Sequence, residues 1–304
     1  MLAVCLLAGI VLQRTRRLPD NAHGTLNALI IHVSLPALTL HYLHSFSFDA
    51  SHLVPVLMPW LLFAIGALLF WAVGRALRLA RPTVGALTLV GGFGNTSFVG
   101  LPMIESLYGA SGMPLGLLID QLGSYLALST VGIMAAAFYA DAQPGAALTM
   151  RSIARKVFTF PPFVAMLLAL VLVPLRFPEP LDLALGRIGD TLAPLALLSV
   201  GLQLRFGALR ERAGALCVGL GYKLLACPAM TIAVLWAMEA GPDMASRVTV
   251  IESAMPPMIG AGIVAAQARL DSQLVSMMIG IGIPLAFATV PAWNWLFKTV
   301  AVAA

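Results

Sequence analysis

Hydrophobic stretches follow one another along nearly the whole chain, separated by short groups of charged residues, prolines and glycines. Most of them reach the roughly 20 residues that an α-helix needs to cross about 30 Å of hydrocarbon. Read in order, the apolar segments are 1–13, 24–44, 53–74, 83–108, 112–140, 157–176, 182–204, 214–238, 246–268 and 273–297. The pattern therefore predicts an all-α membrane protein with ten transmembrane helices, called spans 1 to 10 below.

Span 1 is shorter than the others, because its apolar run ends at Arg14. It is a short helix, a packed partial span, or the remnant of a longer start. A cleaved signal peptide is disfavoured, since no basic residue precedes the apolar run, whereas Arg14, Arg16 and Arg17 follow it.

The composition agrees with a chain that faces lipid. Hydrophobic residues make up 60% and charged residues 10% of the sequence, whereas a soluble domain carries about 25% charged residues. The net charge of +5 does not indicate nucleic-acid binding, because the basic residues lie in short groups between apolar stretches. The three cysteines have no metal-ligand spacing and are interpreted as packing residues: Cys5, Cys217 and Cys227.

Lysine and arginine alternate between the connections. Most of the 18 basic residues fall in the loops after spans 1, 3, 5 and 7, for example at Arg14, Arg78, Arg155 and Arg210. The positive-inside rule places these loops in the cytoplasm. The chain is therefore predicted to be a multi-pass protein of the inner (plasma) membrane with both termini on the periplasmic side.

A polar stretch near residues 141–150 divides the chain into two halves of five predicted spans. Because five is odd, related halves must insert in opposite orientations, and the second span of each half has a central proline, Pro36 or Pro194. The predicted domains are a first five-helix repeat at 1–141, a cytoplasmic linker at 142–156 and a second, inverted repeat at 157–304.

The fourth span of each half is interrupted. Residues 91–102 read GGFGNTSFVGLP and residues 252–262 read ESAMPPMIGAG. A proline inside a helix costs about 3 kcal/mol, and freed backbone groups cost more in lipid unless protein, water or a ligand satisfies them. Either segment alone could be an ordinary proline kink. Interruptions at matching positions of two halves, however, are typical of a transporter site at the membrane midplane.

Residues 94–102, GNTSFVGLP, resemble the first crossover motif of the auxin efflux carrier family, which includes many bacterial permeases. ESAMPP at 252–257, followed by Asp271, resembles its second motif, and the resemblance covers essentially the whole chain. It implies two inverted five-helix repeats whose broken spans 4 and 9 cross. It also implies a scaffold of spans 1, 2, 6 and 7, which could form a homodimer, and a transport domain of spans 3–5 and 8–10 that moves as an elevator.

The wider superfamily includes bile-acid sodium symporters, whose sodium sites use an asparagine of the first crossover and a glutamate of the second. Asn95 and Glu252 match these positions. The glutamine that often follows that glutamate is replaced here by Pro256 and Pro257. The resemblance therefore leaves the coupling ion open between Na⁺ and H⁺, and no other cofactor is expected.

Ionisable groups in the middle of a membrane each need a partner or a role. Counting about 1.5 Å per residue from the span ends places four polar residues near the middle third of the membrane: Asn95, Asp120, Lys223 and Glu252. Asp120, Gln121 and Glu252, with Asn95, are the predicted ion-coupling residues. Asp120 and Lys223 could instead form a structural ion pair, and Gln121 could bond between helices.

The broken helices also favour an anion. Pro102 suits the first turn of the half-helix after the first break, and a second half-helix follows Pro257. Helix N-termini carry partial positive charge, so together with Lys223 they favour a carboxylate. The predicted substrate-binding residues are Asn95, Thr96, Ser97, Pro102, Lys223, Pro256 and Pro257.

The sequence thus predicts a secondary transporter of a small organic anion, such as a mono- or dicarboxylate, coupled to H⁺ or Na⁺ or uncoupled. A cation/proton antiporter on a related fold is the alternative. An enzyme is not expected, since no HExxH, partnered GxSxG or Walker motif occurs. His32 and His41 could carry protons, but they fall in scaffold span 2, where structural roles are favoured. The expected partners are the anion and the lipid bilayer.

Overall fold

The described part of the chain is helical. The computed structural model describes residues 1–304 except 20, 47–48, 141–148, 176, 205–211 and 304, and of 300–303 only the backbone. Within these residues there is no strand, only one isolated antiparallel bridge between Gly94 and Pro257. The all-α prediction is confirmed.

The α-helices are α1 Leu2–Thr15, α2 Ala22–Leu29, α3 Leu35–Leu43, α4 Leu53–Ala76, α5 Arg81–Ala86, α6 Leu101–Tyr108, α7 Met113–Leu118, α8 Ile133–Tyr139, α9 Met150–Thr159, α10 Pro161–Leu172, α11 Glu179–Gly189, α12 Leu192–Gln203, α13 Ala213–Gly221, α14 Cys227–Ala237, α15 Met244–Ser253, α16 Ile259–Gln267 and α17 Ser272–Ala303. Wider π-helical turns are η1 Ile30–Ser34, η3 Leu87–Gly91, η4 Thr96–Gly100, η6 Ile119–Tyr125, η7 Leu128–Gly132 and η8 Tyr222–Ala226. Short 3₁₀ turns are η2 Ala50–His52 and η5 Gly109–Gly112.

Six continuous helical segments of the described chain are long and apolar enough to cross a membrane: Ala22–Leu43, Ala50–Ala76, Thr96–Tyr139, Glu179–Gln203, Ala213–Ala237 and Ser272–Thr299. A seventh would be α9 with α10, which are bent by 70° at Phe160. The helix α1 has only 14 residues. The halves of the second broken segment, α15 and α16, have 10 and 9 residues, whereas the half after the first break is the start of Thr96–Tyr139. The chain is thus a multi-pass membrane protein, whereas ten spans and the inverted repeat stay predictions.

Three π-turns immediately precede a proline. The turns η1, η4 and η8 lead into α3, α6 and α14, whose second residues are Pro36, Pro102 and Pro228. Proline has no N–H, and its ring clashes with the carbonyl four residues earlier, so a wider turn relieves the strain. The helical run that contains Pro102 consequently begins at Thr96. Pro102 lies in the first turn of α6, as predicted, but the π-turn η4 before it was not predicted.

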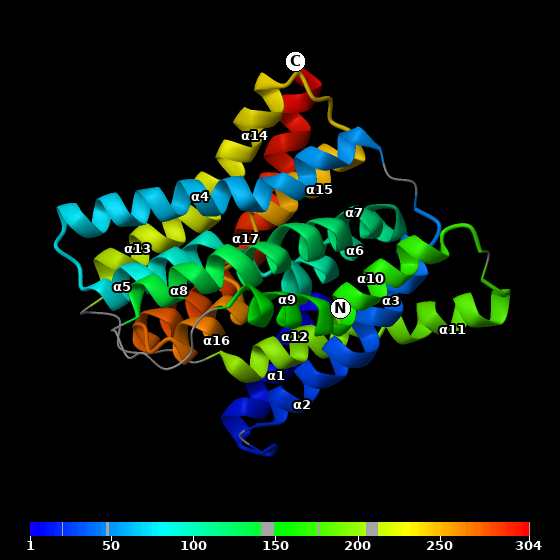
Figure 1. Ribbon diagram of the computed structural model, residues 1–304, viewed down its shortest axis with the longest axis horizontal. Helices are drawn as coiled ribbons and strands as arrows, with labels where there is room; N and C mark the ends of the chain where they lie inside the picture. The colour runs from blue at the N-terminus through cyan, green and yellow to red at the C-terminus, as the bar shows by residue number, and fades with distance from the viewer. Residues whose placement is uncertain (20, 47–48, 141–148, 176, 205–211, 304) are drawn as a thin grey trace. The chain divides into compact units, whose positions relative to one another are not determined.

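The helices form two compact units. Unit 1 contains Met1–Ala50, Ser97–Leu117 and Met150–Leu204, and unit 2 contains Ser51–Thr96, Leu118–Thr149 and Arg205–Ala304. In unit 1, α1 packs against α12, and α3 packs against α10 and α11 (Figure 1). A Cβ at Gly9 would lie 2.3 Å from the carbonyl oxygen of Leu198, so glycine permits this close α1–α12 approach.

The two candidate proton-carrying histidines bond within unit 1. His41 Nδ1 lies 2.7 Å from Asp182 Oδ1 and links α3 to α11, while His32 Nδ1 lies 3.0 Å from the carbonyl oxygen of Ala28 in its own helical run. These contacts agree with structural roles for His32 and His41. Of the predicted linker 142–156, residues 142–148 lie outside the described part, and the rest includes the start of α9.

In unit 2, α4 packs against η6 and α15, while η3 packs against α13, α16 and α17. The helix α4 has Pro59 in its interior. These elements surround the two interrupted segments.

The orientation can be tested at the two ends of α4. A cysteine in place of exposed Asp49 should react with an impermeant maleimide on intact cells, whereas a cysteine in place of exposed Ala80 should react only after permeabilisation. The background is a variant without the three native thiols, Cys5, Cys217 and Cys227, which are free in the structure. The reverse labelling pattern would contradict the predicted orientation.

Candidate functional site

The two interrupted segments meet in unit 2. The backbone N–H of Asn95 donates to the carbonyl of Pro256 at 2.7 Å, and the N–H of Met258 donates to the carbonyl of Phe93 at 3.1 Å. These two bonds flank the bridge between Gly94 and Pro257. Each broken segment thus supplies backbone partners that the other lost with its helix, as a buried backbone in lipid requires.

The local sequence explains why both segments are extended where they meet. Pro256 and Pro257 have no N–H, so α15 ends at Ser253 and α16 begins only at Ile259. On the other side, a Cβ at Gly94 would lie 3.2 Å from the Lys223 ammonium and 3.4 Å from the Glu252 carbonyl oxygen. Glycine therefore leaves room for Lys223 against the crossing.

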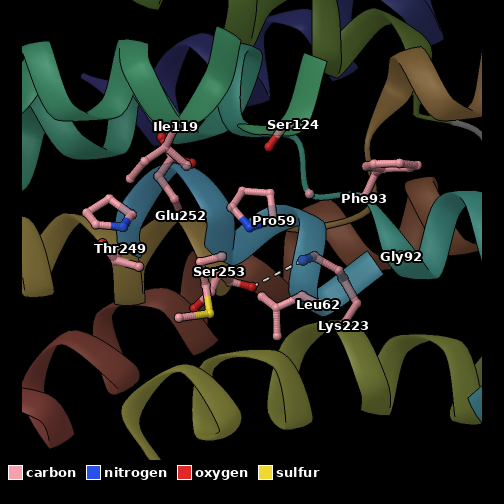
Figure 2. Close-up of a pocket in the computed structure, with 13 residues that line it drawn as sticks. Pro59, Leu62, Gly92, Phe93, Ile119, Ser124, Lys223, Thr249, Glu252 and Ser253 are labelled. Carbon is pink, nitrogen blue, oxygen red and sulfur yellow. Dashed lines mark hydrogen bonds between the residues drawn. The ribbon is translucent and has the colours of Figure 1, made fainter. Parts of the chain in front are cut away.

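A small cavity lies beside the crossing (Figure 2). It has room for about one water molecule, roughly 10 Å³. Its lining comes from α4, the first break, η6, η8 and α15, and comprises Pro55, Met58, Pro59, Leu62, Gly92, Phe93, Gly94, Ile119, Ser124, Lys223, Thr249, Glu252 and Ser253. No organic anion fits this space unless the surrounding elements move.

Lys223 lies in the π-turn η8 and is 2% exposed. Its Nζ donates to the carbonyl of Ser253 at 3.2 Å, the bond drawn as a dashed line in Figure 2. Ser253 is the last residue of α15, so the ammonium lies at the negative end of that helix dipole. The lysine therefore brings a buried positive charge to the crossing.

Glu252 lies one residue earlier and is 3% exposed. Neither carboxyl oxygen has a hydrogen-bond partner among the described residues. Asp120 repels its charge and Lys223 attracts it. Burying a carboxylate without hydrogen bonds is costly, so this group needs a proton or a bound cation to remain in place.

Asp120 and Gln121 lie in η6 and are fully buried, like Asn95 and Thr96 after the first break. The Thr96 hydroxyl donates to Asp120 Oδ1 at 2.5 Å, which ties η6 to the crossing. Eight predicted site residues thus lie in unit 2: Asn95, Thr96, Asp120, Gln121, Lys223, Glu252, Pro256 and Pro257. Among these, Lys223 and Glu252 line the cavity. Ser97 and Pro102 belong to unit 1.

The sequence interpretation missed several polar residues of the cavity. Thr249 and Ser253 line it together with Glu252, and Ser124 lines it from η6. A signal was present, because Thr249 precedes Glu252 by three residues and Ser124 follows Asp120 by four, which places each pair on one helical face. Nothing in the sequence marks Pro59 of α4 as a wall of the cavity.

A metal cluster is not evident in the described part of the chain, where no group of three or more His, Cys, Asp or Glu side chains could hold an ion. Sodium, however, also binds amide, hydroxyl and backbone oxygens. Asn95 and Glu252 therefore remain the candidates for a sodium ion.

The packing of η6 on α4 is tight enough to test. A Cβ at Gly123 would lie 2.8 Å from Pro59 Cγ and 3.0 Å from the Val56 carbonyl oxygen, so Gly123→Ala should lower the free energy of unfolding by about 1–3 kcal/mol. Gly221→Ala is the matched control, because no atom lies within 4 Å of the added methyl. It should leave the melting temperature unchanged or raise it. Equal melting temperatures for wild type and Gly123→Ala would contradict the described packing.

A bundle of apolar helices in which two interrupted helices meet beside buried charges is an arrangement found in membrane transporters. Residues 1–294 match the family described as membrane transport protein. The chain belongs to this family, which is the auxin efflux carrier family whose motifs its two broken segments resemble.

Two curated relatives are named as transporters. A protein of Methanothermobacter thermautotrophicus named as an uncharacterized transporter is 28% identical over 298 residues, which cover 96% of this chain and 94% of the relative. One from Methanocaldococcus jannaschii, named in the same way, is 23% identical over 281 residues, covering 89% and 88%. Both alignments run nearly end to end, so the relationship concerns the whole fold rather than one motif.

Proposed function

We propose that the protein is a secondary transporter of a small organic anion, a mono- or dicarboxylate, which binds at the crossing in unit 2. The buried ammonium of Lys223 carries this proposal. It donates to a neutral backbone carbonyl, and a carboxylate would be a stronger acceptor for the same group. The N-terminus of α16 after Pro257 adds partial positive charge.

The proposed transport is coupled to a cation, either H⁺ or Na⁺. Glu252 supports this, because its carboxyl is buried without a hydrogen-bond partner in the described residues and Asp120 adds a second acidic group nearby. A cation that enters with the anion would neutralise Glu252 and leave Lys223 to the substrate. A monocarboxylate would then balance the charge of Lys223, whereas a dicarboxylate or an ionised Asp120 would each require one further cation.

The proposed motion is that of an elevator, in which spans 3–5 and 8–10 carry the site. In support, unit 2 gathers residues 51–96, 118–149 and 205–304, and both broken segments meet within it. Residues 97–117, which belong to predicted spans 4 and 5, group instead with unit 1. The cavity holds about one water, so substrate entry requires some rearrangement in any mechanism. The periplasmic location of the termini and a homodimer through unit 1 helices are proposed on the loop charges and on the family resemblance.

A cation/proton antiporter is the second candidate, favoured by the proximity of Asp120 to Glu252. In that case the acidic pair would bind the transported ion, and Lys223 would serve only to balance charge. The two candidates differ in whether an organic anion is needed for cation movement.

The deciding experiment uses purified protein in proteoliposomes, with succinate and indole acetate as dicarboxylate and monocarboxylate probes. An anion transporter should show saturable counterflow of a labelled probe and a probe-dependent rise in melting temperature, with pH and sodium varied separately. Cation flux without any carboxylate, and no counterflow with either probe, would favour the antiporter and contradict the proposal.

A further inference from the structure

A second polar cluster lies in unit 2, away from the crossing. It is centred on the carboxylate of Asp271, whose side chain is only 4% exposed. Asp271 Oδ2 accepts from the Thr83 hydroxyl at 2.9 Å and pairs with the guanidinium of Arg212, which also donates to Thr83. Its Oδ1 accepts from the N–H of Leu274 at 3.1 Å. Both oxygens of this buried carboxylate therefore accept hydrogen bonds from the protein.

The cluster joins the starts of three helices. Thr83 is the third residue of α5, Arg212 is the N-cap of α13, and Asp271 is the N-cap of α17. The Asp271 carboxylate therefore sets the axial position of each of these three helices relative to the other two. If one of these helices moved along its axis, its far end would move with it, because a helix is rigid along its axis.

Each of the three helical runs leads from the Asp271 cluster to the crossing over the same number of residues. Eleven residues after Thr83, Arg212 and Asp271 come Gly94, Lys223 and Gly282. Eleven residues of α-helix rise about 16 Å, which sets the scale of each run. Lys223 lies in the π-turn η8, and Gly94 lies just after the helical run that ends at Gly92. At the far end, Gly94 leaves room for the Lys223 ammonium, and a Cβ at Gly282 would lie 2.6 Å from Pro257 Cδ.

A middle layer connects the two ends. A Cβ at Gly219 would lie 2.5 Å from Met278 Cε and 2.9 Å from Leu87 Cδ2, so α13, α17 and η3 touch there. Leu87 and Met278 are completely buried. Because close-packed interiors transmit displacements instead of absorbing them, a shift at the Asp271 cluster should reach the crossing through this layer.

We infer that Asp271, with Arg212 and Thr83, is a positioning residue for the crossing: it sets the axial register of the three helices that bring Gly94, Lys223 and Gly282 together. The inference rests on the proposed function only in taking Lys223 as the anion-binding residue. Asp271 does not touch the cavity, so its effect on binding is indirect.

The test is hydrogen exchange on the full-length protein in detergent, which needs no ligand. In Asp271→Asn, which loses the charge of the Arg212 pair, peptides containing the Asn95 and Met258 amides should exchange about tenfold faster than in wild type, while α12 of unit 1 is unchanged. Arg212→Gln should act in the same way and Arg212→Lys should restore protection. Arg151→Gln, an exposed arginine of α9, is the control.

Unchanged exchange at the crossing, or an equal increase in α12, would overturn the inference, the latter because it indicates general destabilisation. If Asp271→Asn does not insert into the membrane, the exchange measured in Arg212→Gln tests the inference instead, since Arg212 is partly exposed.

The affinity for succinate is the second readout. It should fall about tenfold in Asp271→Asn alone. Added to Lys223→Gln, Asp271→Asn should cause no loss beyond the roughly 100-fold loss of Lys223→Gln, whereas independent sites that far apart give additive free-energy losses, together about 1,000-fold. If wild type binds no succinate, the proposed function is in error for that anion, and the exchange data still decide the role of Asp271.

Discussion

Lys223→Gln should weaken binding of a carboxylate probe on the order of 100-fold. The substitution removes the buried positive charge beside the crossing and leaves Glu252 and Asp120 uncompensated, so an anion entering the site would meet net negative charge. The glutamine can still donate to the Ser253 carbonyl, which should keep the fold intact. The measurement is the dissociation constant of succinate and indole acetate for the purified variant.

Lys298→Gln is the matched control, because it removes an exposed lysine from the same unit. It should bind both probes as wild type does. Wild-type affinity in Lys223→Gln would show that the anion is held elsewhere, and would remove the main support for the proposed site.

Glu252→Gln should abolish cation-driven accumulation of the probe while leaving counterflow, which needs no net cation movement. An amide has nearly the shape of a protonated carboxyl, but it releases no proton and carries no negative charge to hold a cation. Because the variant also removes a buried carboxyl without hydrogen-bond partners in the described chain, its melting temperature should equal or exceed that of wild type. The measurement compares uptake under an imposed gradient with exchange at equilibrium.

Glu105→Gln, a partly exposed carboxyl on α6 in unit 1, provides the comparison and should accumulate the probe normally. Gradient-driven accumulation in Glu252→Gln at the wild-type ratio would assign coupling to another residue, with Asp120 the next to test.

The interruptions of the helices were predictable because their causes are local. Pro256 and Pro257 lack amide hydrogens wherever they occur, and a run of glycines before Asn95 weakens any helix. That Lys223 and Glu252 line one cavity also agrees with counting residues, which predicts both near the middle third of the membrane. Both deductions needed only the chain itself and the dimensions of a bilayer.

The partners of these side chains were not predictable in the same way. Counting places Lys223 and Asp120 at similar depth but does not reveal that the lysine bonds the Ser253 carbonyl or that Thr96 bonds Asp120. The π-turn before Pro102 shifts the start of its helix, since an α-helical register was assumed in reading the sequence. The Asp271 cluster joins residues from three distant parts of the chain, which no local pattern connects.

The size of the cavity has a kinetic consequence. With room for about one water, the described conformation cannot admit a carboxylate, so an anion must wait for a less populated, open arrangement. The observed dissociation constant then equals the intrinsic one divided by the open fraction. In rapid mixing, the observed binding rate should stop rising at high probe concentration, and the plateau would measure the opening rate of the site itself.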